Sequence, residues 1–311
     1  MIALRQPSFW AQGAKRPFYW PLLWLLSLVY GALVSLRNAR ADAVPLAMHS
    51  ICVGNATAGG AGKTPTLLAL AELLGPDKVV FLTRGFGGTE KGPLLVKPHH
   101  TAAQIGDEAL LLARVAPTFV ARDRTLVALD AANLYPGRVL LLDDGLQNPT
   151  FRATVNLLVW DGFGAGNGHI LPAGPLRQPL DRTLAKVDAV ITLDNAQSPL
   201  EPSFAATGSI PHAADRQPVV AFAGIGRPSK FEASLLDGGY NLQCFYPFAD
   251  HHPYSEGELD ALVAHDVPLL TTEKDWVRLP EAARVMVRPV PYRIHFANPA
   301  ALAAALWEHL T

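Results

Sequence analysis

The chain has 311 residues, 50% of them hydrophobic, and a formal net charge of -1. This length allows two domains with a sizeable core, and the apolar content excludes a disordered or fibrous protein. The near-neutral charge gives no basis for a nucleic-acid partner, because proteins that bind the phosphate backbone usually carry a basic surplus. Cys52 and Cys244 are too few for a disulfide framework or a cysteine metal site, which favours a reducing compartment.

The most hydrophobic stretch covers residues 18–36, and basic residues flank it on both sides: Lys15, Arg16, Arg37 and Arg40. A spanning helix needs about 20 apolar residues, so this stretch is borderline for crossing a membrane. Its many aromatic residues suit a helix that lies in or dips into the headgroup layer. Two alternatives stay open, a buried helix of the core and a cleaved signal peptide that ends near residues 39–43.

Residues 51–65 predict a short apolar strand, a glycine-rich loop and the start of a helix. Glycines in such a loop let backbone N–H groups turn towards an anion, and the helix directs its positive end at the same place. Lys63 would bind the β- and γ-phosphates of a nucleotide, and the Thr64 hydroxyl would bind Mg²⁺. The predicted nucleotide-binding residues are Asn55, Thr57, Ala58, Gly59, Gly60, Ala61, Gly62, Lys63, Thr64 and Pro65.

The match to a phosphate-binding loop is incomplete, since Thr57 stands where the usual formula begins with glycine. The alternative is a glycine-rich turn without a ligand. The strand before the loop and the helix after it are the context that the motif requires, so the pattern favours nucleotide binding.

Apolar segments at 78–82, 118–122 and 138–142 predict buried parallel strands, and each ends in charged residues. Open α/β sheets bind ligands at the carboxyl ends of their strands. Arg84 and Arg122 are therefore candidates to hold phosphate or substrate oxygens, with ordinary solvated arginines as the alternative. The pair formed by Asp143 and Asp144 is typical of a Walker B segment, in which an aspartate helps to hold Mg²⁺. An Asp-Asp-Gly turn is the alternative, but the position downstream of a phosphate-binding loop favours the Walker B interpretation.

Further along, residues 163–177 form a glycine- and proline-rich loop that is too long for a simple connection and is predicted to be functional. The polar segment 197–217 is a predicted domain boundary. Beyond it, a second and smaller α/β unit is indicated by short apolar runs that alternate with helical stretches, at 218–223, 242–246, 268–272 and 287–292.

The predicted fold is α/β: a P-loop NTPase-type sheet with helices on both faces, a second smaller α/β domain and an N-terminal hydrophobic helix. The expected domains are residues 1–45 for the membrane-associated helical segment, 46–210 for the P-loop core, and 211–311 for the smaller domain that closes over the active site.

The ordered set of motifs resembles the tetraacyldisaccharide 4′-kinase family, the lipid A 4′-kinases of Gram-negative bacteria. The matching segments follow the family's order and span nearly the whole chain: 53–55 with 59–65, 83–87, 106–108, 142–147, 167–168 with 171–177, 248–251 and 271–277. The resemblance implies phosphoryl transfer from ATP with Mg²⁺ to the 4′-hydroxyl of a tetraacylated glucosamine disaccharide 1-phosphate. It also implies the cytoplasmic face of the inner membrane as the location, and no obligate protein partner.

By the family pattern, Asp107 is the base and His251 its orienting partner. The phosphate-binding loop and the Walker B pattern predict Lys63 and Asp144 as catalytic and Thr64 and Asp143 as metal ligands, with the division of roles between the two aspartates left open. For Asp107, the alternative from composition is a helix-capping acid. The predicted substrate-binding residues come from four separate segments: Arg84 and Arg122 at strand ends, and Asn167 and Arg177 in segments that match the family. Gln178 departs from the family, which usually has glutamate there.

Two rival functions remain. A membrane-associated P-loop ATPase that drives a protein partner usually carries a second lysine near the start of its loop, which residues 54–57 lack. A soluble small-molecule kinase would use the N-terminal helix merely as part of its core.

Overall fold

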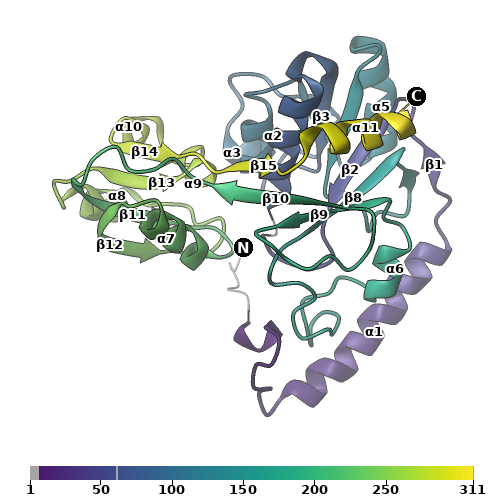
Figure 1. Ribbon diagram of the computed structural model, residues 1–311, viewed down its shortest axis with the longest axis horizontal. Helices are drawn as coiled ribbons and strands as arrows, with labels where there is room; N and C mark the ends of the chain where they lie inside the picture. Colours follow the sequence, from purple (N-terminus) through teal and green to yellow (C-terminus); the bar gives the residue numbers. More distant parts are fainter. Residues whose placement is uncertain (1–6, 61, 311) are drawn as a thin grey trace.

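The computed structural model describes residues 7–60 and 62–310 as two α/β units with a long helix on the outside (Figure 1). Ala61, predicted to belong to the phosphate-binding loop, lies outside the described residues. The larger unit is built on a nine-stranded sheet and the smaller unit on a four-stranded sheet. The predicted fold class is confirmed.

The strands of the larger sheet lie in the order β15-β10-β9-β8-β2-β6-β3-β5-β4. Neighbours are parallel except at the edges, where β4 pairs with β5 and β15 with β10 in antiparallel fashion. The strands are β2 Ser50–Gly54, β3 Val79–Thr83, β4 Leu94–Leu95, β5 Thr118–Val120, β6 Val139–Asp143, β8 Val155–Trp160, β9 Ala189–Leu193, β10 Ser203–Ser209 and β15 Arg293–Phe296. A separate short pair joins β1 (Val44–Pro45) to β7 (Phe151–Arg152).

Helices cover both faces of this sheet. Successive residues of a buried strand point to opposite sides, so both faces present apolar side chains that helices bury. On one side, Val79 and Phe81 pack in the same cluster as residues of three helices, α2 (Lys63–Leu74), α4 (Asp107–Leu112) and α11 (Pro299–Leu310). On the other side, Val80 and Leu82 pack with α5 (Arg124–Leu134). Shorter helical segments are η2 (Pro76–Lys78), α3 (Ala102–Ile105) and α6 (Leu180–Leu184).

The smaller sheet is parallel throughout, in the order β12-β11-β13-β14. Its strands are β11 Pro218–Ala223, β12 Asn241–Pro247, β13 Leu269–Thr272 and β14 Val287–Val290. One face packs on α7 (Pro228–Asp237) and the other on α8 (Glu256–Val263). Two short helices, α9 (Glu273–Trp276) and α10 (Glu281–Arg284), complete this unit.

The chain crosses between the units twice, which the sequence pattern did not predict. The segment 197–217, predicted as a boundary, contains β10, which pairs with β9. After β14 the chain returns, so β15 and α11 belong to the larger unit and the range 211–311 is too long for the smaller one. Both missed strands lie near the sheet edge, where half-exposed residues give no long apolar run.

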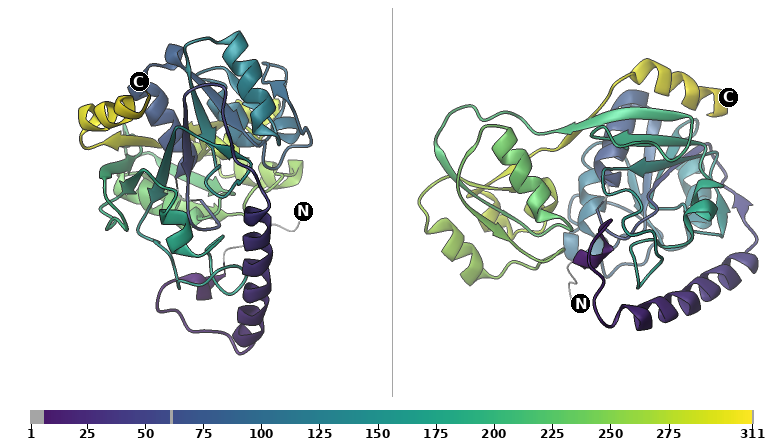
Figure 2. Two further views of the ribbon diagram at one scale, coloured as in Figure 1. Left: turned by 90° about the vertical axis from the view of Figure 1, so that its right-hand side faces the viewer. Right: turned by 60° about the horizontal axis from the view of Figure 1, so that its bottom comes forward.

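Helix α1 (Trp20–Ala39), preceded by the turn η1 (Ser8–Trp10), lies on the outside of the larger unit in both views of Figure 2. Its most apolar window is only 6% buried, and Leu22 and Leu33 are 60% and 61% exposed. The alternative of a buried core helix is therefore wrong. By length and composition, α1 is long and apolar enough to cross a membrane.

Candidate active site

A cavity of about 870 Å³ lies between the two units. The larger sheet contributes the glycine-rich loop after β2 and the ends of β3 and β6, and the smaller sheet contributes the segments after β11, β12 and β13. Both sheets thus present the carboxyl ends of parallel strands, where ligands bind in such folds. Residues of α1 also line the cavity: Tyr30, Val34 and Arg37.

The glycine-rich loop runs from β2 into α2, as predicted. Asn55 is buried within it, donates from Nδ2 to the Thr57 carbonyl at 2.7 Å and accepts at Oδ1 from Lys63 Nζ at 3.0 Å. Gly62 has φ +83°, and a Cβ there would lie 2.8 Å from the side chain of Leu193. A glycine is therefore required at the start of α2, and Lys63 is held in place beside the cavity.

The long loop 163–177 supports the phosphate-binding loop from outside. The Ala58 N–H donates to the Pro175 carbonyl at 2.7 Å, and the Arg177 N–H donates to the Ala56 carbonyl at 3.1 Å. Thr57, the departure from the usual formula, forms an isolated β-bridge with Leu176. The first half of the loop is therefore fixed by backbone pairing rather than by a glycine at position 57.

Asp143 and Asp144 lie at the end of β6, and Asp144 adopts a left-handed conformation with φ +54°. Arg124 Nη2 donates to both of their backbone carbonyls, at 2.9 and 2.8 Å. The Thr83 hydroxyl donates to Asp143 Oδ2 at 3.2 Å, and Arg177 Nη1 donates to Asp144 Oδ2 at 2.7 Å. The two carboxylates are thereby held by separate partners.

The electrostatics of the two aspartates differ. Burial raises the pKa of Asp143, although Lys63 opposes this rise. For Asp144, burial acts in the same direction, but the charges of Lys63 and Arg177 outweigh it and lower the pKa to about 2. Asp143 Oδ1 and Asp144 Oδ1 are buried and have no hydrogen-bond partner among the described residues. With Thr64 in the same cavity, this oxygen-rich donor set fits Mg²⁺.

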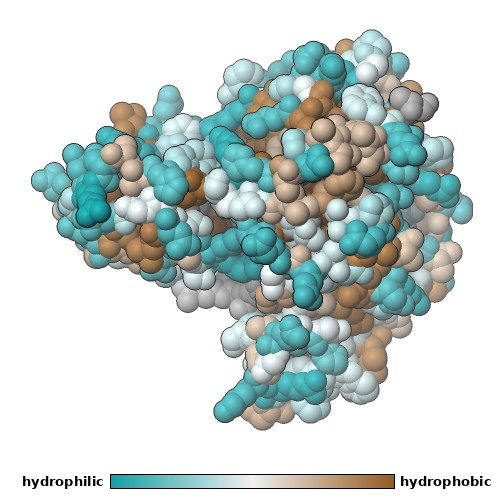
Figure 3. Space-filling model, in the orientation of Figure 1, coloured by the Kyte–Doolittle hydropathy of each residue, from teal (hydrophilic) through white to brown (hydrophobic). Residues whose placement is uncertain are grey.

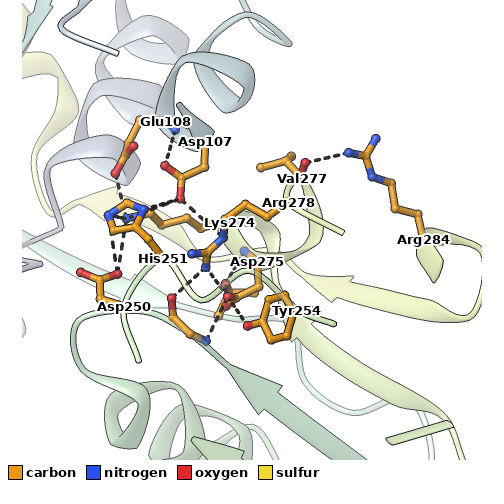
Figure 4. A network of polar contacts seen from close by, with 12 residues as sticks. Asp107, Glu108, Asp250, His251, Tyr254, Lys274, Asp275, Val277, Arg278 and Arg284 are labelled. Atoms are coloured by element: carbon orange, nitrogen blue, oxygen red, sulfur yellow. Dashed lines mark hydrogen bonds and ion pairs between the residues drawn. The ribbon is translucent and has the colours of Figure 1, made fainter. Parts of the chain in front are cut away.

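Asp107 and His251 meet across the junction of the units (Figure 4). Asp107 is the first residue of α4 and is buried, and its Oδ2 lies 3.2 Å from His251 Nδ1. His251 has φ +58°, a conformation uncommon for a residue other than glycine. Its backbone N–H donates to the Gly224 carbonyl at 3.0 Å. The surrounding backbone thus holds the imidazole towards the larger unit.

Charged neighbours complete this cluster (Figure 4). Lys274 Nζ lies 2.8 Å from Glu108 Oε1 and 3.8 Å from Asp107 Oδ2, and Arg278 Nε lies 3.7 Å from Asp107 Oδ2. Oxygen and nitrogen atoms of Asp107, Glu108 and His251 also have the spacing of metal ligands. Lys274 and Arg278 already supply cations there, so the cluster is better described as an ion-pair network.

These contacts shift the titration of the network. Burial alone would raise the pKa of Asp107, but hydrogen bonding with Glu108 and His251 and the charge of Lys274 lower it below its ordinary range. Burial raises the pKa of Glu108 to about 7, against the Lys274 charge. Burial opposes protonation of His251, but the bond to Asp107 outweighs it and raises the His251 pKa.

The two members of the pair differ in access to the cavity. The side chain of His251 is 24% exposed and lines the cavity, whereas that of Asp107 is 1% exposed and lies behind it. Among the described residues, the ion-pair partners of Asp107 Oδ2 are His251, Lys274 and Arg278. The pair therefore presents its imidazole to a ligand and keeps its carboxylate charge behind the imidazole.

Asp275, next to Lys274 in the sequence, holds two segments of the smaller unit together through hydrogen bonds. It is fully buried and accepts hydrogen bonds from the Gly224 N–H at 2.9 Å, the Tyr254 hydroxyl at 2.6 Å and the Thr272 hydroxyl at 2.6 Å. Its own N–H donates to Thr272 Oγ1, which caps α9. Asp275 thus fixes the turn after β11 to the start of α9, close to His251.

The predicted substrate-binding residues divide into two groups. Arg84, Arg122 and Arg177 all line the cavity. Asn167 is not part of the cavity wall, and its Nδ2 donates to the Phe9 and Ala173 carbonyls, both at 3.0 Å. Gln178, which stands where the family usually has glutamate, does not line the cavity either. It is buried and donates to the Thr183 hydroxyl at 3.1 Å.

Sequence reasoning missed three arginines at the site: Arg278, which contacts Asp107, and Arg124 and Arg227. Arg124 is buried and binds the Asp143 and Asp144 carbonyls, but nothing around it in the sequence distinguishes it from a surface residue of α5. Arg227 lines the cavity beside Gly60. The glycines of residues 224–227, placed between a strand and a helix, were a signal that could have identified it.

The family model described as tetraacyldisaccharide-1-P 4′-kinase matches residues 19–311. The chain belongs to the tetraacyldisaccharide 4′-kinase family. Proteins of that name from Methylobacterium sp. (strain 4-46) and Rhodospirillum rubrum are 45% and 41% identical to it, and each comparison covers 97% of both chains. The match to the family thus extends over both units and α1.

A solved structure of the family shows the same fold. The LpxK protein of Aquifex aeolicus, described as an "apo" form in complex with ATP, matches with a TM-score of 0.79 and 25% sequence identity. The match covers 94% of this chain and 100% of that chain. The two-unit arrangement is therefore that of the tetraacyldisaccharide 4′-kinases, which disfavours a P-loop ATPase as the alternative.

Proposed function

We infer that the chain transfers the γ-phosphoryl group of ATP to the 4′-hydroxyl of a tetraacylated glucosamine disaccharide 1-phosphate, a step of lipid A biosynthesis that gives lipid IVA. Family membership supports this activity. The observation that carries the mechanism is that a phosphate-binding loop and an Asp107–His251 pair meet at one cavity.

In this mechanism, the 4′-oxygen forms a bond to the γ-phosphorus while the bond from that phosphorus to the bridging oxygen of ADP breaks. The hydroxyl proton passes to the Asp107–His251 pair. Because phosphoryl transfer has a loose transition state, the acceptor needs orientation more than strong deprotonation. A carboxylate with a lowered pKa behind a cavity-facing imidazole fits this requirement.

On the nucleotide side, Lys63 binds phosphate oxygens, and Arg177 holds Asp144 beside it. Asp143 and the Thr64 hydroxyl would hold Mg²⁺, which neutralises charge on the phosphates when bound. The unpartnered Asp143 Oδ1 supports this assignment. Asp143→Asn should therefore shift the Mg²⁺ titration of activity to higher concentration, and an unchanged titration curve would contradict it.

Helix α1 would place the kinase at the cytoplasmic surface of the inner membrane. Hydrophobic residues reach the surface along the edge of the molecule where α1 runs (Figure 3). Leu25, Val29 and Leu33 of this helix are exposed. The other side of the helix faces the cavity through Tyr30 and Val34. One helix would thus contact the bilayer with one side and border the reaction site with the other, as an acylated substrate requires.

The decisive experiment supplies labelled ATP and the lipid A disaccharide 1-phosphate in mixed micelles. The expected product carries one additional phosphate. ATP hydrolysis without a phosphorylated lipid would instead support an ATPase, and equal activity on a water-soluble sugar without detergent would support a small-molecule kinase. Asp107→Ala is the matched control, since it alters the acceptor side and leaves the phosphate-binding loop intact.

A further inference from the structure

Arg227, in the turn between β11 and α7, crosses from the smaller unit to the phosphate-binding loop. Its Nη2 donates to the Gly60 carbonyl and to the Asp161 carboxylate. The approach is close, because a Cβ on the neighbouring Gly226 would lie 3.4 Å from the backbone nitrogen of Gly60. Arg227 therefore bridges the two units directly at the loop.

Asp161 anchors this arginine. The residue follows β8, its side chain is 8% exposed, and its Oδ1 accepts from the Phe163 N–H at 3.1 Å. Arg227 is its ion-pair partner among the described residues. A buried carboxylate is unfavourable without a paired cation, so Asp161 favours the position of Arg227 beside the loop.

The rest of the guanidinium is available to a ligand. Arginine has five N–H donors, and Nη2 accounts for two of them. Nε and Nη1 have no hydrogen-bond partner in the part of the chain that the structure describes, and Arg227 lines the cavity with its side chain 27% exposed. Phosphate oxygens are the ligands that such a planar donor set binds best.

We propose that Arg227 binds a phosphate oxygen of ATP and so ties the smaller unit to the nucleotide, an inference that rests on the proposed function. Asp161 and the Gly60 carbonyl hold one edge of the guanidinium, and the remaining N–H groups bind the phosphate. The same turn includes Gly224, whose carbonyl accepts a hydrogen bond from the backbone N–H of His251 at 3.0 Å. Nucleotide binding and the placement of His251 are thereby linked.

The test compares ATP with adenosine as ligands of the full-length protein in detergent micelles, by isothermal titration calorimetry. Arg227→Gln should weaken ATP binding about 10- to 100-fold, the range for losing charge-assisted hydrogen bonds, and should leave adenosine binding unchanged. Arg227→Lys should recover part of the affinity for ATP. Arg288→Gln, an exposed arginine of β14, is the matched control and should bind both ligands as the wild type does.

Two results would overturn the inference. The first is unchanged ATP affinity in Arg227→Gln while Lys63→Ala loses it, which would leave the proposed kinase function intact. The second is an equal loss for ATP and adenosine, which would mean that Arg227 only shapes the cavity. If Arg227→Gln does not fold, the ratio of ATP to adenosine affinity in Arg227→Lys decides between the same outcomes.

Discussion

The two halves of the cavity are built in different ways. The nucleotide half comes from one sheet edge of the larger unit, with the loop after β2 beside the aspartates that end β6. The half that we propose activates the acceptor combines Asp107 of the larger unit with His251 and Lys274 of the smaller one. The first half is thus contained in a single sheet, whereas the second exists only where the units meet.

This difference separates the source of most nucleotide contacts from the source of the acceptor chemistry. The phosphate-binding loop and the two aspartates come from the larger unit, and Arg227 is the contact that we propose the smaller unit adds to the nucleotide. The Asp107–His251 pair takes one residue from each unit, so the group that we propose receives the proton depends on how the units meet. Variants in the two halves should therefore fail in different ways.

The largest expected effect is on the acceptor half. Asp107→Ala should lower kcat by about 10²–10⁴, the range for loss of a positioned acid–base group, with little change in KM for ATP. His251→Ala should act on the same step, and the double variant should be little worse than Asp107→Ala, because residues that act as a unit are not additive. Multiplying losses in steady-state kinetics would mean that the two residues act independently.

On the nucleotide half, Lys63→Ala should lower kcat by about 10²–10³, as for loss of one donor to a developing charge, and should also weaken ATP binding. The fold should survive, because Lys63 borders the cavity and is not a core residue. Thermal melting without nucleotide tests the second statement. A variant with wild-type turnover would remove the phosphate-binding loop from the mechanism.

The pH profile separates the two members of the pair. The His251 pKa is raised, so if the imidazole receives the proton, kcat/KM should be low in acid and rise with pH through a value above 6.5. His251→Gln should remove this limb. A profile that stays flat well below pH 6 would instead assign the proton to Asp107 alone, whose pKa is lowered.

The same contact has a signature in stability. A raised His251 pKa means that the pair stabilises the fold below pH 6.5, and that this contribution is lost as the pH rises through the folded value. The free energy of unfolding of the wild type, minus that of His251→Gln, should decrease over this window. Denaturant titrations at several pH values measure it.

The smallest effect on chemistry is expected at the exposed side of α1, whose residues do not line the cavity. Leu25 and Leu33 are 55% and 61% exposed, so replacing both with Asp should weaken vesicle binding and lower the rate on membrane-held substrate while leaving the melting temperature unchanged. The control pair is Leu126→Asp with Leu134→Asp on α5, where the exposure is 58% and 61%. Equal vesicle binding by both pairs would contradict a membrane role for α1.

Much of the larger unit could be read from the sequence, because its information is local. The glycines, lysine and threonine of the phosphate-binding loop lie within the short segment 59–64. Buried parallel strands such as β3 and β6 are continuous apolar runs. The pairing of Asp107 with His251 was predicted only through the family resemblance. Spacing along the chain cannot show that residues of two units meet.

Tertiary structure alone decided three features. The edge strand β15 pairs with β10 from a distant part of the chain, and the half-exposed residues of both strands carry no periodic signal. Arg124 and Arg227 gain their roles from partners in other elements. The sequence around a single arginine does not show which partners it will meet. The exposure of α1 depends on what packs against it, since a core helix and a membrane-surface helix have the same apolar composition.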